Sequence, residues 1–493
     1  FRWLDRDPSD VITVFDEAHN IEGAARDHAT RTLTENTLQQ ALDELEDLDD
    51  SRAEPARNVI GAFLAALRST YDDALGSEYA REQVGDNWED ITVANDDRRD
   101  DLTLAFLQRY KGKGIEIETE LAVQLGKVLD EEYEQAYKNG EATTRSECQT
   151  LQAAEFVSTW MSEGTELGQY PVVSVRRNET TEEVYGRAEL YTCIPRDVTS
   201  ELFEEVASSV LMSATLRPFE VTSEVLGLED VATKAYGMGY PEENRLTYAV
   251  DTPPLFAADR SDSEVQETIA NLLRDAIRFT PGNTLAFFPS YSEAERYHQR
   301  LQSGMDGGPT DPESTGDDPL GTLLLDRPGE DAEELRRRLV GSENAAIFTS
   351  LWGTLAEGVS FDDDDARSVV VVGVPYPHLD DRMEAVQRAY RGAFGDGEED
   401  AGWRYAVEIP TVRKTRQALG RVIRSPEDYG VRVLVDERYT ASRRPDLDEY
   451  SVYPSFPPEE RSEHIDIAPE KLKFAMLNFY TDMDAWDSEP PSP

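Results

Sequence analysis

Residues 11–19 read Val11-Ile12-Thr13-Val14-Phe15-Asp16-Glu17-Ala18-His19 and contain the clearest local signal of the chain. Its first five residues form a short apolar, β-branched run, which predicts a buried strand of a parallel sheet. Two acids follow this strand directly. Ligands of open α/β sheets bind beyond the carboxyl ends of the strands, so Asp16 and Glu17 are expected to face a ligand crevice.

Phosphoryl transfer is a reaction that would use this pair of acids. It needs one carboxylate that holds Mg²⁺ and another group that orients the attacking water. Asp16 suits the first role and Glu17 suits the second. An acidic chain also produces Asp-Glu pairs freely, and most of these are solvated turn residues, so both interpretations stay open for this motif alone.

The second half of the chain repeats the strand-then-helix pattern. Helical patterns, one beginning after Ser290 and another at 379–391, separate apolar runs, which predicts an α/β domain with a doubly wound parallel sheet. A linker at 241–264 is expected to lead into it, and the Gly-, Pro- and Asp-rich segment 305–318 is expected to be a mobile loop. The expected strands are 284–288, 320–325, 345–349, 368–374 and 431–435.

Residues 35–185 show a helical periodicity instead. Apolar residues recur there at three- and four-residue steps, which predicts a mostly helical insertion. Alternation returns near Tyr185, and the run from Ser209 to Ser213 predicts a second buried strand. The clearest helical stretch contains Leu38, Ala41, Leu42, Leu45 and Leu48.

The chain is strongly acidic. It has 100 acidic and 49 basic residues and a net charge of −51, and 41 of the basic residues are Arg. The acids are spread through segments with clear apolar periodicity, which favours a folded protein over a disordered one. In molar salt the Debye length falls to about 3 Å and screens the repulsion within such a surface. We therefore predict a protein adapted to a very salty cytoplasm, in which any nucleic-acid site is a local basic groove.

Composition also excludes several classes of protein. No run approaches the roughly 18 apolar residues that a membrane span needs. Cys148 and Cys193 are too few for a disulfide framework or for a metal site made of cysteines alone. We expect a cytoplasmic protein without membrane attachment, whose thiols are buried or idle.

A second motif is Gln417-Ala-Leu-Gly420-Arg421-Val-Ile-Arg424. On a helix, Gln417, Arg421 and Arg424 would fall on one face at steps of four and three. A planar guanidinium can bind phosphate oxygens bidentately and stabilise the charge that develops during phosphoryl transfer. The alternative is that these arginines are ordinary salt-bridge partners of the many acids around them.

Two weaker motifs follow other expected strands. Ser213-Ala214-Thr215 is, by itself, most simply a turn or a helix cap. The stretch Gly353-Thr-Leu-Ala-Glu357-Gly358-Val-Ser-Phe361 follows the strand at 345–349. Gly358 allows close approach of the backbone, and Glu357 is suited to organising a loop that faces nucleotide or nucleic acid.

Together and in this order, the motifs resemble helicase superfamily 2, and specifically the XPD-type DNA helicases, with the bacterial DinG helicases as relatives. The helical insertion corresponds, in position and helicity rather than in sequence, to the arch domain of these proteins. The matching stretches are the DEAH box at 16–19, Leu-Met-Ser-Ala-Thr-Leu at 211–216, Glu357-Gly358 with Phe361, Val374-Pro375-Tyr376-Pro377, and Gln417 to Arg424 followed by Asp428-Tyr429-Gly430.

The resemblance implies a role for each motif. Asp16 and Glu17 would bind Mg²⁺ and activate water, and His19 would couple this site to the Ser-Ala-Thr motif. Ser213, Ala214 and Thr215 would link hydrolysis to the grip on DNA. Gln417, Arg421 and Arg424 would close onto the γ-phosphate of ATP, and the expected nucleotide-binding residues are Gly353, Glu357, Gly358 and Gly420.

The resemblance also implies an activity and a domain order. The activity is that of an ATP- and Mg²⁺-dependent helicase that moves five-prime to three-prime along single-stranded DNA, unwinds duplex junctions and serves DNA repair or related DNA metabolism. The expected parts are the end of a first RecA-like motor domain at 1–34, an arch-like insertion at 35–185, a return to the first motor domain at 186–243, a second RecA-like motor domain at 244–482 and a disordered acidic tail at 483–493.

Three departures from the family pattern qualify these expectations. Ser360 stands where the family usually has aspartate. No G-x-x-x-x-G-K-[ST] loop occurs in the 493 residues, so we expect a fragment that is inactive as an ATPase by itself. Family members also hold an iron–sulfur cluster on four cysteines before the DEAH box, a region that would lie upstream of Phe1, so no cluster is expected in this chain.

Two other classes of function remain open. One is a nucleic-acid-binding remnant without ATPase activity. The other is a carboxylate metal hydrolase that uses Asp16, Glu17 and His19 and needs no nucleotide. The second alternative leaves the arginines of 417–424 without a role.

Overall fold

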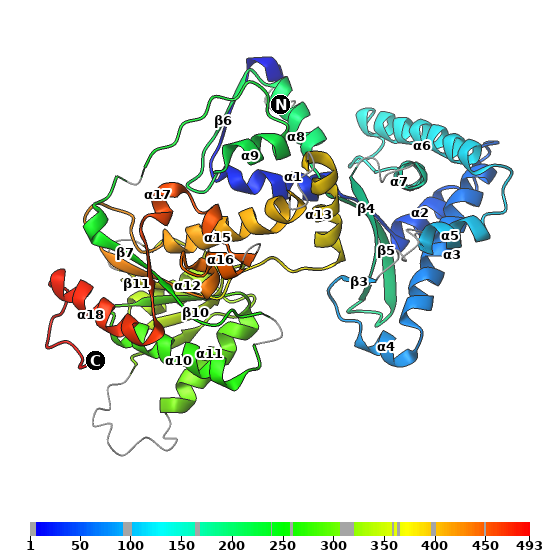
Figure 1. Cartoon of the computed structure of the whole chain (residues 1–493). Coiled ribbons are helices and arrows are strands. Elements are labelled where there is room, and N and C mark those ends of the chain that lie inside the picture. Colours follow the sequence, from blue (N-terminus) through cyan, green and yellow to red (C-terminus); the bar gives the residue numbers. More distant parts are fainter. Residues whose placement is uncertain are drawn as a thin grey trace. The chain divides into compact units, whose positions relative to one another are not determined.

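A computed structural model describes residues 6–91, 101–162, 168–237, 239–256, 260–305, 320–356, 359–361, 365–395, 401–447 and 450–493. The chain divides into two compact units (Figure 1). Unit 1 consists of Phe1–Leu211, Ser223–Glu229 and Leu379–Glu399, and unit 2 consists of Met212–Thr222, Asp230–His378 and Asp400–Pro493.

Unit 2 contains a seven-stranded sheet in the order β13-β7-β12-β11-β8-β10-β9. Every neighbouring pair in it is parallel, which confirms the expected α/β class. The strands are β7 (Arg245–Val250), β8 (Thr284–Phe288), β9 (Leu323–Leu325), β10 (Ala346–Ser350), β11 (Ser368–Val372), β12 (Gly430–Val435) and β13 (His464–Ile467).

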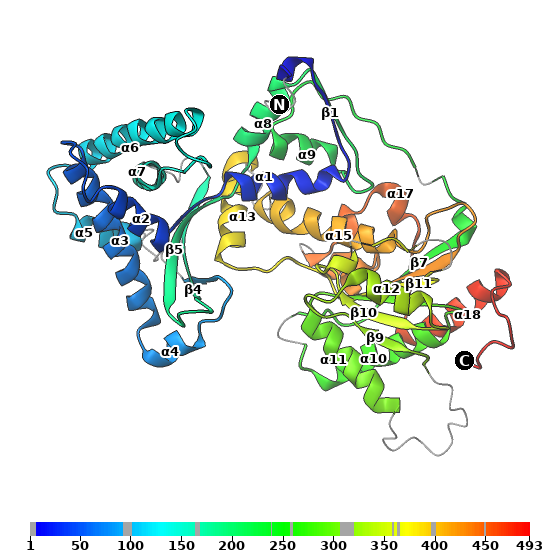
Figure 2. The same cartoon turned by 180° about the vertical axis from the view of Figure 1, so that it is seen from behind.

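Helices cover both faces of this sheet (Figure 2). Successive side chains of a strand point to opposite faces, so Ala286 and Phe288 of β8 pack with α10, α11 and α18, whereas Leu285 and Phe287 pack with α12 and α15. The sheet is therefore doubly wound, as predicted. The helices are α10 (Ser263–Arg278), α11 (Tyr291–Met305), α12 (Ala332–Val340), α14 (Ala401–Trp403), α15 (Ile409–Leu419), α16 (Arg444–Leu447), α17 (Pro458–Arg461) and α18 (Leu472–Asp482).

Sequence periodicity located five of the seven strands of unit 2. It missed β7 and β13, and β7 lies inside the segment 241–264 that we expected to be a linker. Turn residues and prolines flank the six residues of β7 on both sides, so the segment resembled a linker. Strand β13 is only four residues long, which is too short for a clear alternation of side chains. The expected mobile loop at 305–318 lies, apart from its first residue, outside the described residues.

The expected tail at 483–493 begins with packed residues. Met483, Ala485 and Trp486 contact the core that α10 and α18 share, and the ring of Trp486 meets that of Tyr480 edge-on at 6.4 Å. The large apolar surface of the indole explains why this segment docks although its sequence is acidic.

Unit 1 begins with two parallel strands, β1 (Ile12–Phe15) and β6 (Ser208–Leu211). The predicted strands and their parallel direction are confirmed, but their expected burial is wrong: Ile12 is 67% and Val14 is 62% exposed. Among the described residues β1 pairs with β6 alone, so this face of the two-stranded sheet stays uncovered. The helices nearest in sequence are α1 (Ile21–Ala29), α8 (Arg196–Glu205) and α9 (Phe219–Leu226).

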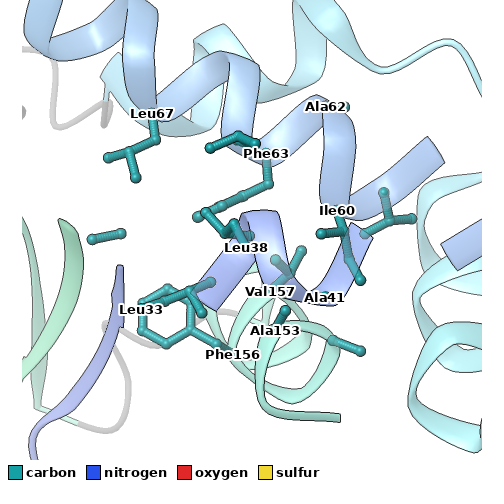
Figure 3. Close-up of a cluster of buried hydrophobic side chains, with 14 of the residues drawn as sticks. Leu33, Leu38, Ala41, Ile60, Ala62, Phe63, Leu67, Ala153, Phe156 and Val157 are labelled. Carbon is teal, nitrogen blue, oxygen red and sulfur yellow. The ribbon is translucent and has the colours of Figure 1, made fainter. Parts of the chain in front are cut away.

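The insertion of unit 1 is mostly helical, as expected, and has its own core. Side chains of α2, α3 and α7 meet there (Figure 3), with Phe63 of α3 in edge-on contact with Phe106, Phe156 and Trp160. The helices are α2 (Glu35–Glu44), α3 (Ala53–Leu75), α4 (Glu78–Gln83), α5 (Asp101–Arg109), α6 (Ile115–Lys138) and α7 (Gln149–Met161).

A four-stranded antiparallel sheet, which the sequence did not lead us to expect, completes the insertion. We call it the insertion sheet; its order is β2-β5-β4-β3. The strands are β2 (Arg31–Thr34), β3 (Glu89–Ile91), β4 (Gln169–Arg177) and β5 (Val184–Thr192). One face, with Val173, Val175, Ala188 and Leu190, packs on the helical core, and β5 runs seven residues beyond position 185, up to which we expected helices. None of the described helices is long and apolar enough to span a bilayer.

Candidate functional site

The Asp16-Glu17 pair forms the turn that directly follows β1. Both carboxylates are exposed, and Asp16 Oδ1 accepts a hydrogen bond from the Glu17 amide at 2.9 Å. Glu17 has φ 49° and ψ 43°, a left-handed conformation that is uncommon for a residue with a side chain and concentrates at functional turns. His19 Nδ1 lies 3.3 Å from Glu17 Oε2, and its own side chain is only 6% exposed.

This turn fits a magnesium site of the kind that is completed by phosphates. Mg²⁺ is commonly held by one or two protein carboxylates, with substrate phosphates and water filling the other positions. Among the described residues no group of three or more His, Cys, Asp or Glu side chains is arranged to hold a metal by itself. The exposed carboxylates of this turn are oxygen ligands of the kind that Mg²⁺ uses in such sites.

The Ser-Ala-Thr run follows the strand beside β1. The register pairs Phe15 with Leu211, so both strands end at the same level before their motifs begin. The Thr215 amide donates to Ser213 Oγ at 3.1 Å, which closes a tight turn, and the Thr215 side chain is buried. The run is thus a hydroxyl-stabilised turn, the conformation that its sequence alone favoured.

Two arginines of α15 hold the segment that contains this turn. Arg416 Nη2 donates to the Ala214 carbonyl at 3.2 Å, and Arg413 Nη2 donates to the Leu216 carbonyl at 3.0 Å. Sequence analysis missed both arginines. Arg413 lies four residues and Arg416 one residue before Gln417 on the same helix, and this proximity to the motif could have identified them as candidate site residues.

The arginines of the 417–424 motif do not form the predicted helical stripe. Helix α15 ends at Leu419, so Gln417 is helical whereas Arg421 and Arg424 lie beyond its end. The carboxylate of Asp428 accepts hydrogen bonds from the backbone amides of Arg424 and Ser425 at 2.8 and 2.7 Å. These bonds stabilise a turn in place of another helical turn.

The same two arginines nevertheless reach the glycine motif. The buried Arg421 guanidinium donates to the backbone carbonyls of Ala356 and Val359. Arg424 Nη1 donates to Ser360 Oγ at 3.0 Å, so Ser360 takes part in this contact although it departs from the family pattern. Two motifs that lie about 60 residues apart in the sequence are thereby joined. Glu357 and Gly358 themselves lie outside the described residues.

Gly353 and Gly420, the two remaining glycines of the site, differ in the space available for a side chain. A Cβ on Gly353 would overlap the Tyr291 hydroxyl and lie 3.1 Å from the Ser350 carbonyl, so a larger residue there would require the Tyr291 side chain to shift. At Gly420, φ is −72° and a Cβ would make ordinary contacts at 3.5 Å. The backbone at 420 therefore accepts other residues, and nothing in its geometry requires a glycine.

A buried ion pair directly follows β12. Arg438 donates from Nε and Nη2 to the two oxygens of Asp436 at 2.8 and 2.7 Å, and the side chains are 1% and 0% exposed. The guanidinium also lies over the rings of Phe256 and Tyr376 at 4.6 and 5.3 Å. Sequence analysis did not identify this pair, because acids and arginines are common throughout the chain.

Comparisons with known proteins agree with the motifs. Residues 273–447 match the family model of the helicase C-terminal domain. The general transcription and DNA repair factor IIH helicase subunit XPD of Schizosaccharomyces pombe is 28% identical over 269 residues, which cover 51% of this chain and 33% of that protein. The Fanconi anemia group J protein homolog of Gallus gallus is 22% identical over 488 residues, which cover 87% of this chain and 37% of that protein.

The chain spans about a third of the length of the curated relatives it matches first. A solved XPD helicase structure has a TM-score of 0.48 and 19% sequence identity and covers 95% of this chain and 70% of its own. Residues 273–447 match the helicase C-terminal domain, and the motifs before and within this range follow the order seen in the XPD-type helicases of superfamily 2, which the chain resembles.

Proposed function

We propose that this chain is part of an ATP-driven DNA helicase that translocates five-prime to three-prime along single-stranded DNA and works in DNA repair. The observation that carries the proposal is the register of β1 and β6, after which the Asp-Glu pair and the Ser-Ala-Thr run follow two adjacent parallel strands. This is the edge at which open α/β sheets bind ligands. It is supported by the similarity to relatives that are named as XPD helicase subunits of the general transcription and DNA repair factor IIH.

In this proposal the residues of unit 1 serve hydrolysis. Bound ATP·Mg²⁺ supplies the phosphoanhydride to be cleaved and the metal charge. Asp16 holds the metal, and Glu17 orients and deprotonates the attacking water. His19 Nδ1 is 3.3 Å from Glu17 Oε2 and fixes the orientation of that carboxylate. In the proposal, His19 also couples hydrolysis to the Ser-Ala-Thr turn.

The residues of unit 2 bind phosphate and couple hydrolysis to DNA. Gln417, Arg421 and Arg424 act on the γ-phosphate, and Arg421 also holds the glycine motif through two carbonyls. Gly353, Glu357, Gly358 and Gly420 are proposed to line the nucleotide, and Ser213, Ala214 and Thr215 to connect hydrolysis with the grip on DNA. Single-stranded DNA is held by phosphate contacts and by stacking on aromatic side chains, without sequence readout.

The test is ATP hydrolysis by the protein expressed from its whole gene, in molar KCl, with and without single-stranded DNA. We expect DNA to stimulate hydrolysis and Glu17→Gln to lower kcat about 100-fold or more, because a positioned general base contributes that much. Glu131→Gln, which changes an exposed residue of α6, is the matched control and should leave kcat unchanged.

Each other outcome contradicts a different part of the proposal. DNA binding without any hydrolysis would identify a binding remnant. Metal-dependent cleavage of a substrate without nucleotide would identify a carboxylate hydrolase. We further propose that the 493 residues alone do not turn over ATP, since they contain no phosphate-binding loop sequence. DNA-stimulated turnover by this chain alone would overturn that statement.

A further inference from the structure

Helix α13 (Asp381–Phe394) follows β11 of unit 2 in sequence but packs within unit 1. The residues before it, up to His378, and those after it, from Asp400, belong to unit 2. The chain thus leaves unit 2, contributes one helix to unit 1 and returns.

The first turn of α13 is tied to the insertion sheet through Arg382. Its Nη2 donates to Asp90 Oδ1 of β3 at 2.8 Å, its Nη1 donates to Glu189 of β5, and the guanidinium lies 4.9 Å from the centre of the Tyr191 ring. Glu189 is only 3% exposed, so this contact is shielded from water. Burial alone would raise the pKa of Asp90, but hydrogen bonds from Arg382 and Ser174 outweigh it and lower that pKa.

The third turn of α13 is tied to helix α1 through Tyr390. Its fully buried hydroxyl donates to Glu22 Oε1 and accepts from Arg26 Nη2, at 2.5 and 3.0 Å. Burial and the neighbouring Glu22 carboxylate raise the pKa of Tyr390, so the phenol stays protonated and donates. Helix α1 begins at Ile21, two residues after His19, and therefore follows the Asp16-Glu17 turn without a linker.

We propose that Tyr390 and Arg382 are positioning residues, through which α13 couples the Asp16-Glu17 turn to the insertion sheet. Tyr390 fixes α1 and, through it, the turn that carries Glu17, while Arg382 fixes the sheet. The two anchors are eight residues apart, about 12 Å along a rigid helix. This coupling rests on the proposed function for its role in the ATPase cycle, but the contact itself can be tested separately.

Hydrogen exchange of the chain tests the anchoring without any assay of activity. Tyr390→Phe removes only the hydroxyl, and we expect amide exchange in residues 21–29 to rise between about twofold and tenfold, which is the worth of one buried hydrogen bond. Tyr297→Phe is the matched control, because Tyr297 is also fully buried but its hydroxyl has no hydrogen-bond partner among the described residues. Unchanged exchange in residues 21–29 of Tyr390→Phe would overturn the anchoring.

The coupling is tested by the ratio of DNA-stimulated to basal ATP hydrolysis in the protein expressed from its whole gene. Arg382→Lys keeps the charge but loses the fork that reaches both acids, and we expect this ratio to fall at least threefold while basal kcat stays within twofold. Arg388→Lys, which changes an exposed pair with Glu384 on the same helix, should leave the ratio unchanged. An unchanged ratio in Arg382→Lys would overturn the coupling, whereas wild-type protein without hydrolysis would instead refute the proposed function.

Discussion

At the scale of single residues, burial decides how strongly the loss of one charged side chain lowers the free energy of unfolding. Asp436 and Arg438 form an ion pair with almost no exposed surface. Asp50 and Arg52 have the same two-residue spacing and the same hydrogen bond from Arg Nε to Asp Oδ1, but both of their side chains are 27% exposed. Breaking a buried pair leaves an uncompensated charge in a medium of low dielectric constant, whereas water solvates the remaining partner at the surface.

Asp436→Asn should therefore lower the free energy of unfolding of unit 2 by about 3–5 kcal/mol, because the buried Arg438 guanidinium loses its negatively charged partner. Asp50→Asn, the matched surface change, should cost unit 1 less than about 1 kcal/mol. Denaturant-dependent hydrogen exchange measures the two units separately. Equal losses at the two sites would contradict the argument from burial.

His464 makes the stability of unit 2 depend on pH. Burial lowers the pKa of this β13 residue to about 4, below its ordinary value near 6.5. The unfolded chain then binds a proton that the folded chain does not, so stability is complete above pH 6.5 and is lost as the pH falls toward 4. His464→Gln should reduce the loss of unfolding free energy between pH 6.5 and pH 4 by about 2–3 kcal/mol. Exchange-derived unfolding free energies at pH 7 and pH 4.5 check this, with His28→Gln on the exposed side of α1 as the control.

At the scale of elements, the end of α15 separates two roles within one arginine motif. Arg421 is buried and donates to two carbonyls of the glycine motif, while Arg424 is exposed and contacts Ser360. A single helical stripe would have made the two arginines equivalent. Because the helix stops at Leu419, one of them holds the fold of the motif and the other faces solvent.

Arg421→Ala should lower the free energy of unfolding of unit 2 by about 2–3 kcal/mol, because two backbone carbonyls lose a charged donor. Arg424→Ala should cost less than about 1 kcal/mol, yet it should lower ATP hydrolysis at least tenfold if its charge acts on the γ-phosphate. Denaturant-dependent exchange and ATPase assays on the same preparations separate these effects. The reverse order of the two stability losses would refute the division of roles.

At the scale of the whole molecule, the net charge of −51 opposes compactness. At low ionic strength the acids repel one another over roughly 10 Å or more, and molar salt shortens that range to about 3 Å. The arginine-rich ion pairs inside both units offset part of this repulsion locally. Screening by the solvent has to offset the rest.

The midpoint of thermal unfolding should therefore rise by at least about 10 °C when KCl is increased from 0.1 to 2 M. Sucrose of equal osmolality strengthens burial without screening charge and serves as the control. We expect the rise in KCl to exceed the rise in sucrose. Equal effects, or a fall in KCl, would contradict adaptation to a salty cytoplasm.

Elements with a local sequence signal could be predicted before the structure was known. The doubly wound sheet, its five clearest strands, the helical character of the insertion and the presence of strands at β1 and β6 all follow from periodicity, because side chains alternate along a strand and recur every three to four residues along a helix. The position of Asp16 and Glu17 directly after a strand follows in the same way. These features need only neighbours in sequence.

Features that depend on partners far away in the sequence became visible only in the folded chain. Whether Ile12 is covered, where α15 ends, which carbonyls Arg421 reaches and that α13 belongs to unit 1 all depend on residues tens to hundreds of positions away. The same holds for the insertion sheet, whose strands β2 and β5 are more than 140 residues apart. Long-range packing and burial, not local propensity, determine such contacts, so no pattern of adjacent residues could have predicted them.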